Sequence, residues 1–275
     1  MQDISALIPS PAMADAPYFS VLVPFFDSAD TVEACAEALL AQVDADDEIE
    51  RQVELLFIDN ASTDDAPQRI ERLAARDPRL RLLHETTPGA YAARNAGLRA
   101  ARGHVVAFTD ADCTPGPTWL RSIREALDDP TVGIVLGRCR YPSGASWPLN
   151  LLGAYENAKT DYVLRRCGPA HRFGYTNNLA ARREIFDALG PFKPWRRAAD
   201  SEMVHRLAAR RPDLSVVYEP SMVVVHHEFR TARQRLARLR TYTGTNTQIE
   251  TFRELGRLQR LGVAAHLLRG WRRFL

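Results

Sequence analysis

Residues 105–114 read VVAFTDADCT, an apolar run that ends abruptly in two aspartates one residue apart. Both faces of the run are apolar and its length suits a strand, so it predicts a fully buried strand of a parallel sheet. Asp110 and Asp112 would then lie at the carboxyl end of that strand, where open α/β sheets bind their ligands. Two carboxylates this close repel each other unless a cation lies beside them, and Mg²⁺ or Mn²⁺ is the natural partner. The alternative for so short a pattern is a solvated turn that caps the next helix.

Strand-like and helix-like segments alternate on both sides of this run. Four predicted strands precede Cys113, and the intervals between them have apolar residues at helical spacing, which is typical of βαβ units around a parallel sheet. The first strand should stop at Pro24, because proline cannot continue the ladder. No GxGxxG pattern follows that strand, which argues against a dinucleotide fold of the dehydrogenase kind. We expect strands at residues 18–24, 53–58, 80–84, 105–109, 132–140, 174–182 and 216–225, and helices at 28–42, 67–77, 89–103, 115–128, 147–166, 183–189 and 198–210.

The composition, 45% hydrophobic and 25% charged in 275 residues, is ordinary for a soluble globular protein with a sizeable core. The four cysteines have no CxxC spacing, so neither a zinc site nor a disulfide framework is predicted, and reduced thiols fit a cytoplasmic protein. Residues 1–17 lack the basic start and long apolar core of a secretory signal, and we expect a flexible lead-in there. No stretch approaches the ~20 apolar residues that span a bilayer. The cysteines are Cys35, Cys113, Cys139 and Cys167.

The end of the chain is strongly basic. From residue 229 onward 11 Arg stand against 2 Glu, a local charge of +9 within a chain whose net charge is +2. Residues 252–275 also carry apolar side chains at helical spacing, which predicts a basic amphipathic helix. Such a helix fits a peripheral anchor on the anionic inner face of a membrane, or a helix that packs on the preceding domain or on a second subunit of a homodimer. Nucleic-acid binding is disfavoured, because an Arg-rich stretch without a known nucleic-acid-binding module is weak evidence for it.

Short motifs occur along the chain, several of them at the ends of the predicted strands. Their series resembles that of family 2 glycosyltransferases with the GT-A fold, from about Phe19 to His227. The resemblance implies an α/β domain at 18–228 with a Rossmann-like, mostly parallel sheet flanked by helices. Residues 18–113 would form its nucleotide-binding half and residues 114–228 its acceptor-binding half, with 229–275 as a helical tail. The motifs are VP at 23–24, DNASTD at 59–64, RNAG at 94–97, TDAD at 109–112, Asn178 with Arg182, DSE at 200–202 and HH at 226–227.

The resemblance assigns the donor-binding side to Pro24, Asp27, Asp59, Arg94 and Asp110. The residue in the position of Asp59 accepts a hydrogen bond from the base, usually uracil, and Asp110 would face the ribose or the water shell of the metal. Arg94 would bring a permanent charge to the diphosphate. Many members have Asn where this chain has Asp27, so contacts to the base are expected to differ there. The alternative roles are a turn residue for Asp59 and a surface ion pair for Arg94.

The metal, Mn²⁺ or Mg²⁺, is assigned by the resemblance to Asp112. A late histidine serves some members as a further ligand, and both His226 and His227 match that position. Because adjacent residues of a strand point to opposite faces, at most one of the two is expected to face Asp112. A structural histidine is the alternative for either ring.

Catalysis is assigned to Asp200, the expected general base for the acceptor hydroxyl. A hydroxyl is a poor nucleophile at neutral pH, so a carboxylate within hydrogen-bond reach should take its proton as the new bond forms. The usual Glu before this Asp is replaced by Ala199, which removes any help from that carboxylate. Glu202 takes the place of the second acid of the motif, and Arg206 one turn later is spaced to pair with it.

The acceptor side is assigned to Asn177, Asn178, Glu202 and Trp195. Asn177 and Asn178, followed by Arg182, match the acceptor stretch of the family. Trp195 precedes two arginines and could form a platform for a sugar ring. Core packing is an equal alternative for this tryptophan.

The resemblance therefore implies a metal-dependent, inverting glycosyltransferase. It would move a sugar from a nucleoside-diphosphate sugar, with a UDP-sugar as the expected donor, to a hydroxyl of a saccharide, lipid-linked or other acceptor in the synthesis of a polysaccharide, glycolipid or other glycoconjugate. Residues 110–114 also fit the Asp-x-Asp-x-Thr of haloacid-dehalogenase-type phosphatases, with Asp110 as nucleophile. That motif normally follows the first core strand, whereas three strands precede it here. A domain of the same fold that only binds a partner is the second alternative.

Overall fold

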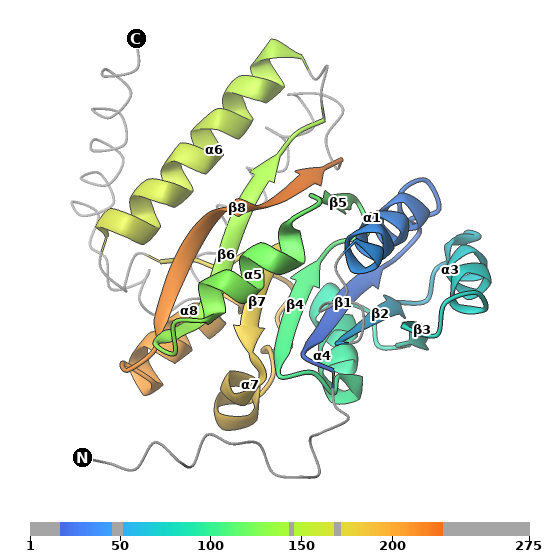
Figure 1. Ribbon diagram of the computed structural model, residues 1–275, viewed down its shortest axis with the longest axis horizontal. Coiled ribbons are helices and arrows are strands. Elements are labelled where there is room, and N and C mark those ends of the chain that lie inside the picture. Colours follow the sequence, from blue (N-terminus) through green and yellow to red (C-terminus); the bar gives the residue numbers. More distant parts are fainter. Residues whose placement is uncertain (1–16, 46–51, 143–145, 168–171, 228–275) are drawn as a thin grey trace.

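The structure is a computed structural model that describes residues 17–45, 52–142, 146–167 and 172–227. Almost all of the predicted lead-in and the whole of the basic tail lie outside these residues, as do residues 46–51, 143–145 and 168–171. The described chain forms one eight-stranded mixed sheet with helices on both faces (Figure 1). No helix of the described ranges combines the length and apolar character that crossing a membrane requires.

The strands lie in the order β3-β2-β1-β4-β7-β6-β8-β5. The first four of these run parallel, as the alternation of strands and helices predicted. β7 then lies antiparallel between β4 and β6, and β5 lies antiparallel to β8 at the other edge. The strands are β1 (Phe19–Phe25), β2 (Val53–Asp59), β3 (Leu80–His84), β4 (Val105–Thr109), β5 (Cys113–Pro115), β6 (Val132–Arg140), β7 (Asn178–Arg182) and β8 (Ser215–His226).

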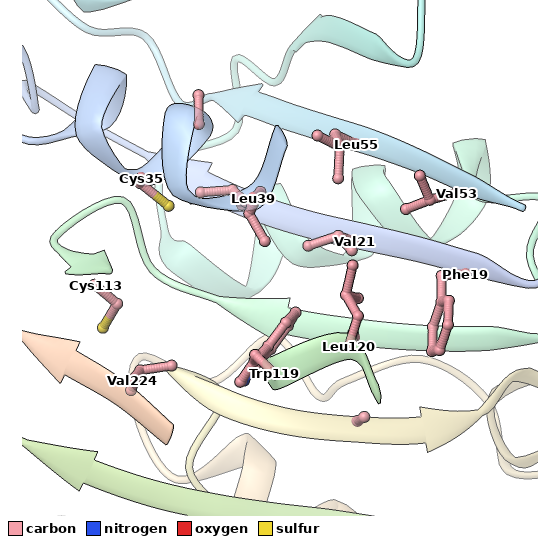
Figure 2. Close-up of a cluster of buried hydrophobic side chains, with 14 of the residues drawn as sticks. Phe19, Val21, Cys35, Leu39, Val53, Leu55, Cys113, Trp119, Leu120 and Val224 are labelled. Atoms are coloured by element: carbon pink, nitrogen blue, oxygen red, sulfur yellow. The ribbon is translucent and has the colours of Figure 1, made fainter. Parts of the chain in front are cut away.

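The side chains of β1 alternate between two hydrophobic clusters, because successive residues of a strand point to opposite faces. Val21 and Val23 pack with α1, α3 and α5 in one cluster, and Figure 2 shows Val21, Leu39 and Trp119 among its members. Leu22 packs with α4, α7 and α8 in the other. The helices are α1 (Val32–Asp44), α3 (Ala66–Ala74), α4 (Ala90–Ala100), α5 (Trp119–Leu127), α6 (Trp147–Arg166), α7 (Arg183–Leu189) and α8 (Ala199–Arg210).

Several boundaries differ from those expected from sequence, and two of these differences have a clear structural reason. β1 continues through Pro24 to Phe25. Its pairing with β4 ends at Leu22, so no bond to β4 needs the missing N–H of the proline. The helix expected from Pro115 begins only at Trp119, because residues 113–115 form the short strand β5 against β8.

A buried carboxylate ties together three segments at the amino-terminal edge of the sheet. Glu54 is 2% exposed and accepts hydrogen bonds from the Ser20 hydroxyl at 2.7 Å and the Arg102 N–H at 2.7 Å. It also pairs with the guanidinium groups of Arg81 and Arg102, each at 3.1 Å. Burial alone would raise the pKa of Glu54, but the hydrogen bonds from Ser20 and Arg102 outweigh it and hold the pKa below its ordinary value.

We expect Glu54→Gln to lower the free energy of unfolding at pH 7 by about 1–2 kcal/mol, since the arginines it pairs with are partly exposed and can be hydrated. A carboxylate whose pKa is lowered by folding stabilises the protein above its unfolded pKa and loses that contribution as the pH falls. The difference between variant and wild type should therefore shrink as the pH falls below 4.5, the ordinary value for Glu, towards the lowered pKa of folded Glu54. Urea unfolding across this pH range measures it.

The matched control is Glu33→Gln, which removes an exposed partner of Arg69. We expect little change in stability from that variant at any pH, because exposed ion pairs contribute little. A Glu54→Gln penalty that stayed constant with pH would argue against an ionised Glu54 as the source of the stability.

Candidate active site

The strands β1, β2 and β4 end around an open pocket of about 220 Å³. Pro24 and Phe25 at the end of β1 line one part of it, and the first turns of α4 line another. Asp110 and Asp112, which follow β4, complete the wall. The two aspartates thus lie at the carboxyl edge of the sheet, where the pattern of residues 105–114 predicted them, and they face the same space.

Asp27 and Asp59 shape the loops beside this pocket. Asp59 is buried; its Oδ1 accepts a hydrogen bond from the Ser62 N–H at 2.9 Å, and its Oδ2 lies 3.1 Å from Nδ1 of His84. Asp27 has φ of 47°, in the left-handed region that short polar residues tolerate, and its Oδ1 accepts from the Thr63 N–H at 2.7 Å. Neither aspartate is among the residues that line the pocket, but each adjoins one that does, Phe26 or Asn60.

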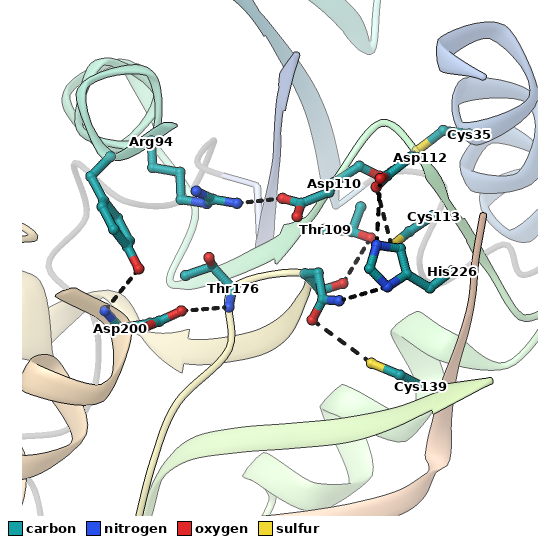
Figure 3. Close-up of polar contacts among 12 residues, drawn as sticks. Cys35, Arg94, Thr109, Asp110, Asp112, Cys113, Cys139, Thr176, Asp200 and His226 are labelled. Carbon is teal, nitrogen blue, oxygen red and sulfur yellow. Dashed lines mark hydrogen bonds and ion pairs between the residues drawn. The ribbon is translucent and has the colours of Figure 1, made fainter. Parts of the chain in front are cut away.

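Arg94 is a buried cation in the wall of the pocket. It extends from α4 and forms an ion pair with Asp110 (Figure 3). Its carbon Cζ lies 5.5 Å from the centre of the Tyr91 ring, at cation–π range. Its Nε is buried and has no hydrogen-bond partner among the described residues. The surface ion pair considered for Arg94 is therefore wrong, because the guanidinium lies inside the pocket wall.

Asp112 faces His226 across the sheet edge. The antiparallel pairing of β5 with β8 sets Cys113 opposite His226, and Nε2 of His226 lies 3.4 Å from Oδ2 of Asp112. His227 turns the other way: its N–H donates to the Asp112 carbonyl at 2.8 Å, and its ring Nε2 lies 2.8 Å from the Thr114 hydroxyl. Of the two histidines that the sequence left open, His226 has its ring beside the carboxylate.

Asp200 lies in the first turn of α8, directly after Ala198, which has φ of 64° and precedes the helix. Its Oδ1 accepts from the Ser201 N–H at 2.8 Å and its Oδ2 from the Thr176 N–H at 3.3 Å. Burial raises the pKa of Asp200, while these hydrogen bonds and the charge of Arg94 oppose that rise. The result is a carboxyl group with a raised pKa that is held in place from two elements.

Tyr91 connects Asp200 to α4. Its hydroxyl oxygen accepts a hydrogen bond from the Asp200 N–H at 3.4 Å, and the proximity of this hydroxyl to the carboxylate lowers the pKa of Asp200. Tyr91 and Arg94 are three residues apart on α4 and share one face of it. One helix face therefore contacts Asp110 through Arg94 and Asp200 through Tyr91.

Asn178 does not fit the predicted role in acceptor binding. It is fully buried in β7, and its amide nitrogen donates to the carbonyls of Arg138 and Met222, each at 3.0 Å. Its Oδ1 accepts from the indole N–H of Trp119 at 2.8 Å. A Cβ at Gly137 would lie 2.4 Å from this amide, so the glycine makes room for it. Asn178 therefore ties β7 to β6, β8 and α5 and has no polar atom left for a substrate.

The other predicted acceptor residues have different surroundings. Asn177 is partly buried, and its Nδ2 lies 3.5 Å from Nδ1 of His226, next to the proposed metal site. Glu202 pairs with Arg206 at 2.9 Å on α8, as their spacing predicted. Trp195 is partly buried against the cluster beneath α7 and α8, so part of its ring serves core packing.

The model of the family "Glycosyl transferase family 2" matches residues 20–203 of this sequence. The chain belongs to glycosyl transferase family 2. Among curated family relatives, the glycosyltransferase AglE of Haloferax volcanii is 26% identical over 179 residues, which cover 64% of this chain and 56% of AglE. The succinoglycan biosynthesis protein ExoO of Rhizobium meliloti is 36% identical over 184 residues, 63% of this chain and 50% of ExoO. The chain thus spans about half the length of these relatives.

Solved structures agree with this family assignment. The mannosyltransferase PcManGT from Pyrobaculum calidifontis, in complex with GDP-Man and Mn²⁺, is 27% identical with a TM-score of 0.63; the match covers 82% of this chain and 62% of PcManGT. The glucosyl-3-phosphoglycerate synthase of Mycobacterium tuberculosis has a TM-score of 0.59 at 21% identity, over 86% of this chain and 80% of that one, a likeness of fold alone. The GT-A type of α/β fold that the motifs implied is therefore confirmed.

Two groups of this family 2 site were missed from the sequence. Tyr91 lies one helical turn before Arg94, and that spacing could have placed it on the same face. The Thr176 N–H had no signal in the sequence, because any residue offers a backbone N–H and only the fold brings this one to Asp200.

Proposed function

We propose that the chain transfers a sugar from a nucleoside-diphosphate sugar to an acceptor hydroxyl, with inversion at the anomeric carbon and with Mn²⁺ or Mg²⁺ as cofactor. The observation that carries the proposal is the convergence of Asp110, Asp112, Arg94 and Asp200 at one edge of the sheet. These groups come from the loop after β4, from α4 and from α8, and they supply a carboxylate for a metal, a cation for a diphosphate and a base for an acceptor.

The donor pocket offers a cationic wall for the diphosphate. Arg94 lines it with a buried guanidinium whose Nε is unused among the described residues, and the amino-terminal end of α4 also favours an anion. Asp59, at the end of β2, is proposed to accept an N–H of the base, and Asp27 to support the same loop. We propose a UDP-sugar as donor. A GDP-sugar is the main competitor, because the related PcManGT is in complex with GDP-Man and Mn²⁺.

The proposed metal ligands are Asp112 and His226. A carboxylate and an imidazole whose ligand atoms lie 3.4 Å apart fit Mn²⁺, and the carboxylate alone with water fits Mg²⁺. His227 is not proposed as a ligand, because its ring contacts Thr114 instead. A bound cation would neutralise the charge that develops on the departing nucleoside diphosphate. Arg94 would hold the diphosphate from the opposite side, and Asp110 would orient Arg94 through their ion pair.

Asp200 is proposed to remove the proton of the acceptor hydroxyl. The acceptor oxygen then forms a bond to the anomeric carbon as the bond from that carbon to the diphosphate oxygen breaks, and the leaving group keeps the electron pair. A single displacement of this kind inverts the anomeric configuration. The raised pKa of Asp200 makes it a stronger base than an exposed aspartate, which suits this step.

We expect Tyr91→Phe to lower kcat/KM by up to about tenfold on the acidic side of the pH profile, since losing a hydrogen bond of about 1.5 kcal/mol to the carboxylate raises its pKa by about one unit. The hydrogen bond from Tyr91 lowers the pKa of Asp200, so its loss should raise that pKa further. Because the base must be deprotonated, the acidic limb of the pH profile should move to higher pH. A pH series of kcat/KM for wild type and variant measures both effects.

The control is Tyr162→Phe, which removes a partly buried tyrosine hydroxyl on α6, away from the pocket lining. We expect its pH profile to superimpose on that of the wild type. A Tyr91→Phe variant that is slower but has an unmoved acidic limb would show that Tyr91 acts only in packing.

The acceptor is proposed to approach from the side of α8 and the segment before β7. Asn177, Glu202 and Trp195 remain the candidates for contacting it. The name of ExoO, a succinoglycan biosynthesis protein, supports a saccharide acceptor in polysaccharide synthesis. Binding to an anionic membrane surface and dimerisation are proposals for residues 229–275, which lie outside the described residues.

The deciding experiment incubates the protein with Mn²⁺ and a panel of UDP-, GDP- and dTDP-sugars and follows release of the nucleoside diphosphate. We expect release from one sugar class, and loss of release in Asp112→Ala and Asp200→Ala. Phosphate release from simple monoesters, abolished by Asp110→Asn, would instead support the phosphatase alternative. Inactivity in both assays, with nucleotide binding retained, would support the binding module. Membership in family 2 already argues against the phosphatase.

A further inference from the structure

A cysteine thiol lies next to the two proposed metal ligands. The side chains of Asp112, Cys113 and His226 each offer one ligand atom, and these atoms lie within 4.8 Å of one another. Cys113 is 1% exposed and directly opposite His226 in the pairing of β5 with β8. Figure 3 shows the sulfur beside the imidazole and the carboxylate. The cysteine spacing in the sequence gave no sign of such a site, because its other two ligands are not cysteines.

We propose that Asp112, Cys113 and His226 together form a binding site for Zn²⁺, with the Cys113 thiolate as one of three protein ligands. A set of one oxygen, one nitrogen and one sulfur is the mixture that this borderline-soft ion binds in proteins. Three protein ligands leave a fourth position for water or a substrate atom. The proposal concerns metal binding alone and does not depend on sugar transfer.

The observed distances are close to those of a zinc tetrahedron. Bond lengths of about 2.0 Å to oxygen and nitrogen and about 2.3 Å to sulfur give ligand separations of roughly 3.3 Å for oxygen to nitrogen and roughly 3.5 Å for oxygen to sulfur. Nε2 of His226 lies 3.4 Å from Oδ2 of Asp112, and Sγ of Cys113 lies 3.8 Å from Oδ1 of the same carboxylate. These two distances involve different oxygens of the Asp112 carboxylate, and the three ligand atoms lie within 4.8 Å of one another, so closing the site needs side-chain shifts of about an ångström.

The surroundings hold these ligands in place. Asn177 lies 3.5 Å from Nδ1 of His226, on the far side of the ring from Asp112, so Nε2 faces the carboxylate. Neighbouring groups that fix a ligating histidine in this way typically strengthen metal binding. The Asp112 carbonyl accepts the His227 N–H at 2.8 Å, which anchors the loop to β8.

The Cys113 thiol is a suitable ligand for one class of cation and not for another. Mn²⁺ and Mg²⁺ prefer oxygen ligands and would leave Cys113 protonated, whereas Zn²⁺ would bind the thiolate and release one proton to water. Both classes need Asp112, so they exclude one another. The site would therefore take up Zn²⁺ in competition with the harder ion.

The test titrates the full-length protein with Cd²⁺, a soft probe for zinc sites, and records the sulfur-to-metal charge-transfer absorption in the ultraviolet. We expect the band to saturate at one equivalent in the wild type and to be absent from Cys113→Ser, with Cd²⁺ affinity lowered at least about tenfold. Cys35→Ser is the matched control: Cys35 is also 1% exposed, but its Sγ faces the Asp110 carbonyl at 3.7 Å. This control should keep both the band and the affinity.

Mn²⁺ binding, followed by water-proton relaxation, should be unchanged in Cys113→Ser and shows that the variant is folded. Should that variant fail to fold, X-ray absorption of the Zn²⁺-loaded wild type decides, with one sulfur expected at about 2.3 Å from the ion. A zinc shell of nitrogen and oxygen alone, or a Cd²⁺ band that persists in Cys113→Ser, would overturn the proposal.

Discussion

Asp200→Asn is expected to lower the rate of sugar transfer by about 10³-fold, within the range that a general base contributes. The amide cannot take the proton of the acceptor hydroxyl, yet it has the size of the carboxylate and can still accept from Ser201 and Thr176. Donor binding should be unchanged, because Asp200 does not line the donor pocket. Single-turnover rates and donor dissociation constants measure the two effects separately.

The pH dependence gives a second signature of the same role. Burial raises the pKa of Asp200, so wild-type kcat/KM should fall as the pH drops through that raised value. The Asn variant should lack this acidic limb. Asp213→Asn, which removes an exposed partner of Arg211, serves as the control and should behave as wild type. A near-normal rate in Asp200→Asn would remove Asp200 from the mechanism.

Asp112→Asn should weaken Mn²⁺ binding by at least about 100-fold, because Asp112 is the negatively charged member of the two proposed ligands, Asp112 and His226. Metal assistance contributes several kcal/mol to transfer, so the rate should fall by at least about 10³-fold at fixed metal concentration. Relaxation titration with Mn²⁺ and initial rates of nucleoside diphosphate release measure the two losses.

Asp110→Asn is the informative comparison for this variant. The carboxylate of Asp110 forms an ion pair with Arg94. Removing its charge should therefore change Mn²⁺ affinity by less than about tenfold and mainly weaken donor binding. Equal loss of Mn²⁺ affinity in the two variants would mean that both aspartates are ligands and would contradict the division of roles proposed here.

The sequence predicted the parallel part of the fold well, because a buried strand and an amphipathic helix have different periods. It did not predict that β7 runs antiparallel. The residue pattern of a short strand such as residues 178–182 is equally compatible with a parallel and an antiparallel neighbour. The direction of the strand is decided by the path of the chain that leads to it. The three-residue strand β5 was missed for a related reason, since its pairing with β8 joins residues more than a hundred positions apart.

Within the site, the sequence motifs predicted which residues come together more reliably than they predicted what each residue does. Asn178 matched an acceptor motif, but its contacts with Trp119 and Met222 depend on the tertiary fold. The adjacent histidines were expected to point to opposite faces, and they do. Which of them faces Asp112 depends on the register between β5 and β8, so His226 could be singled out only in three dimensions.

The direction of β7 has a consequence for how such proteins diversify. β1, β2 and β4 reach the catalytic edge with their last residues, whereas β7 reaches it with its first, as the pairing of Thr109 with Asn178 requires. Insertions or deletions ahead of β7 can therefore change the segment proposed to contact the acceptor, while β7 keeps its register and the carboxylates after β4 keep their positions. The same donor-binding half can in this way be combined with different segments before β7. Exchanging this segment between family members is the natural first step in redesigning acceptor specificity.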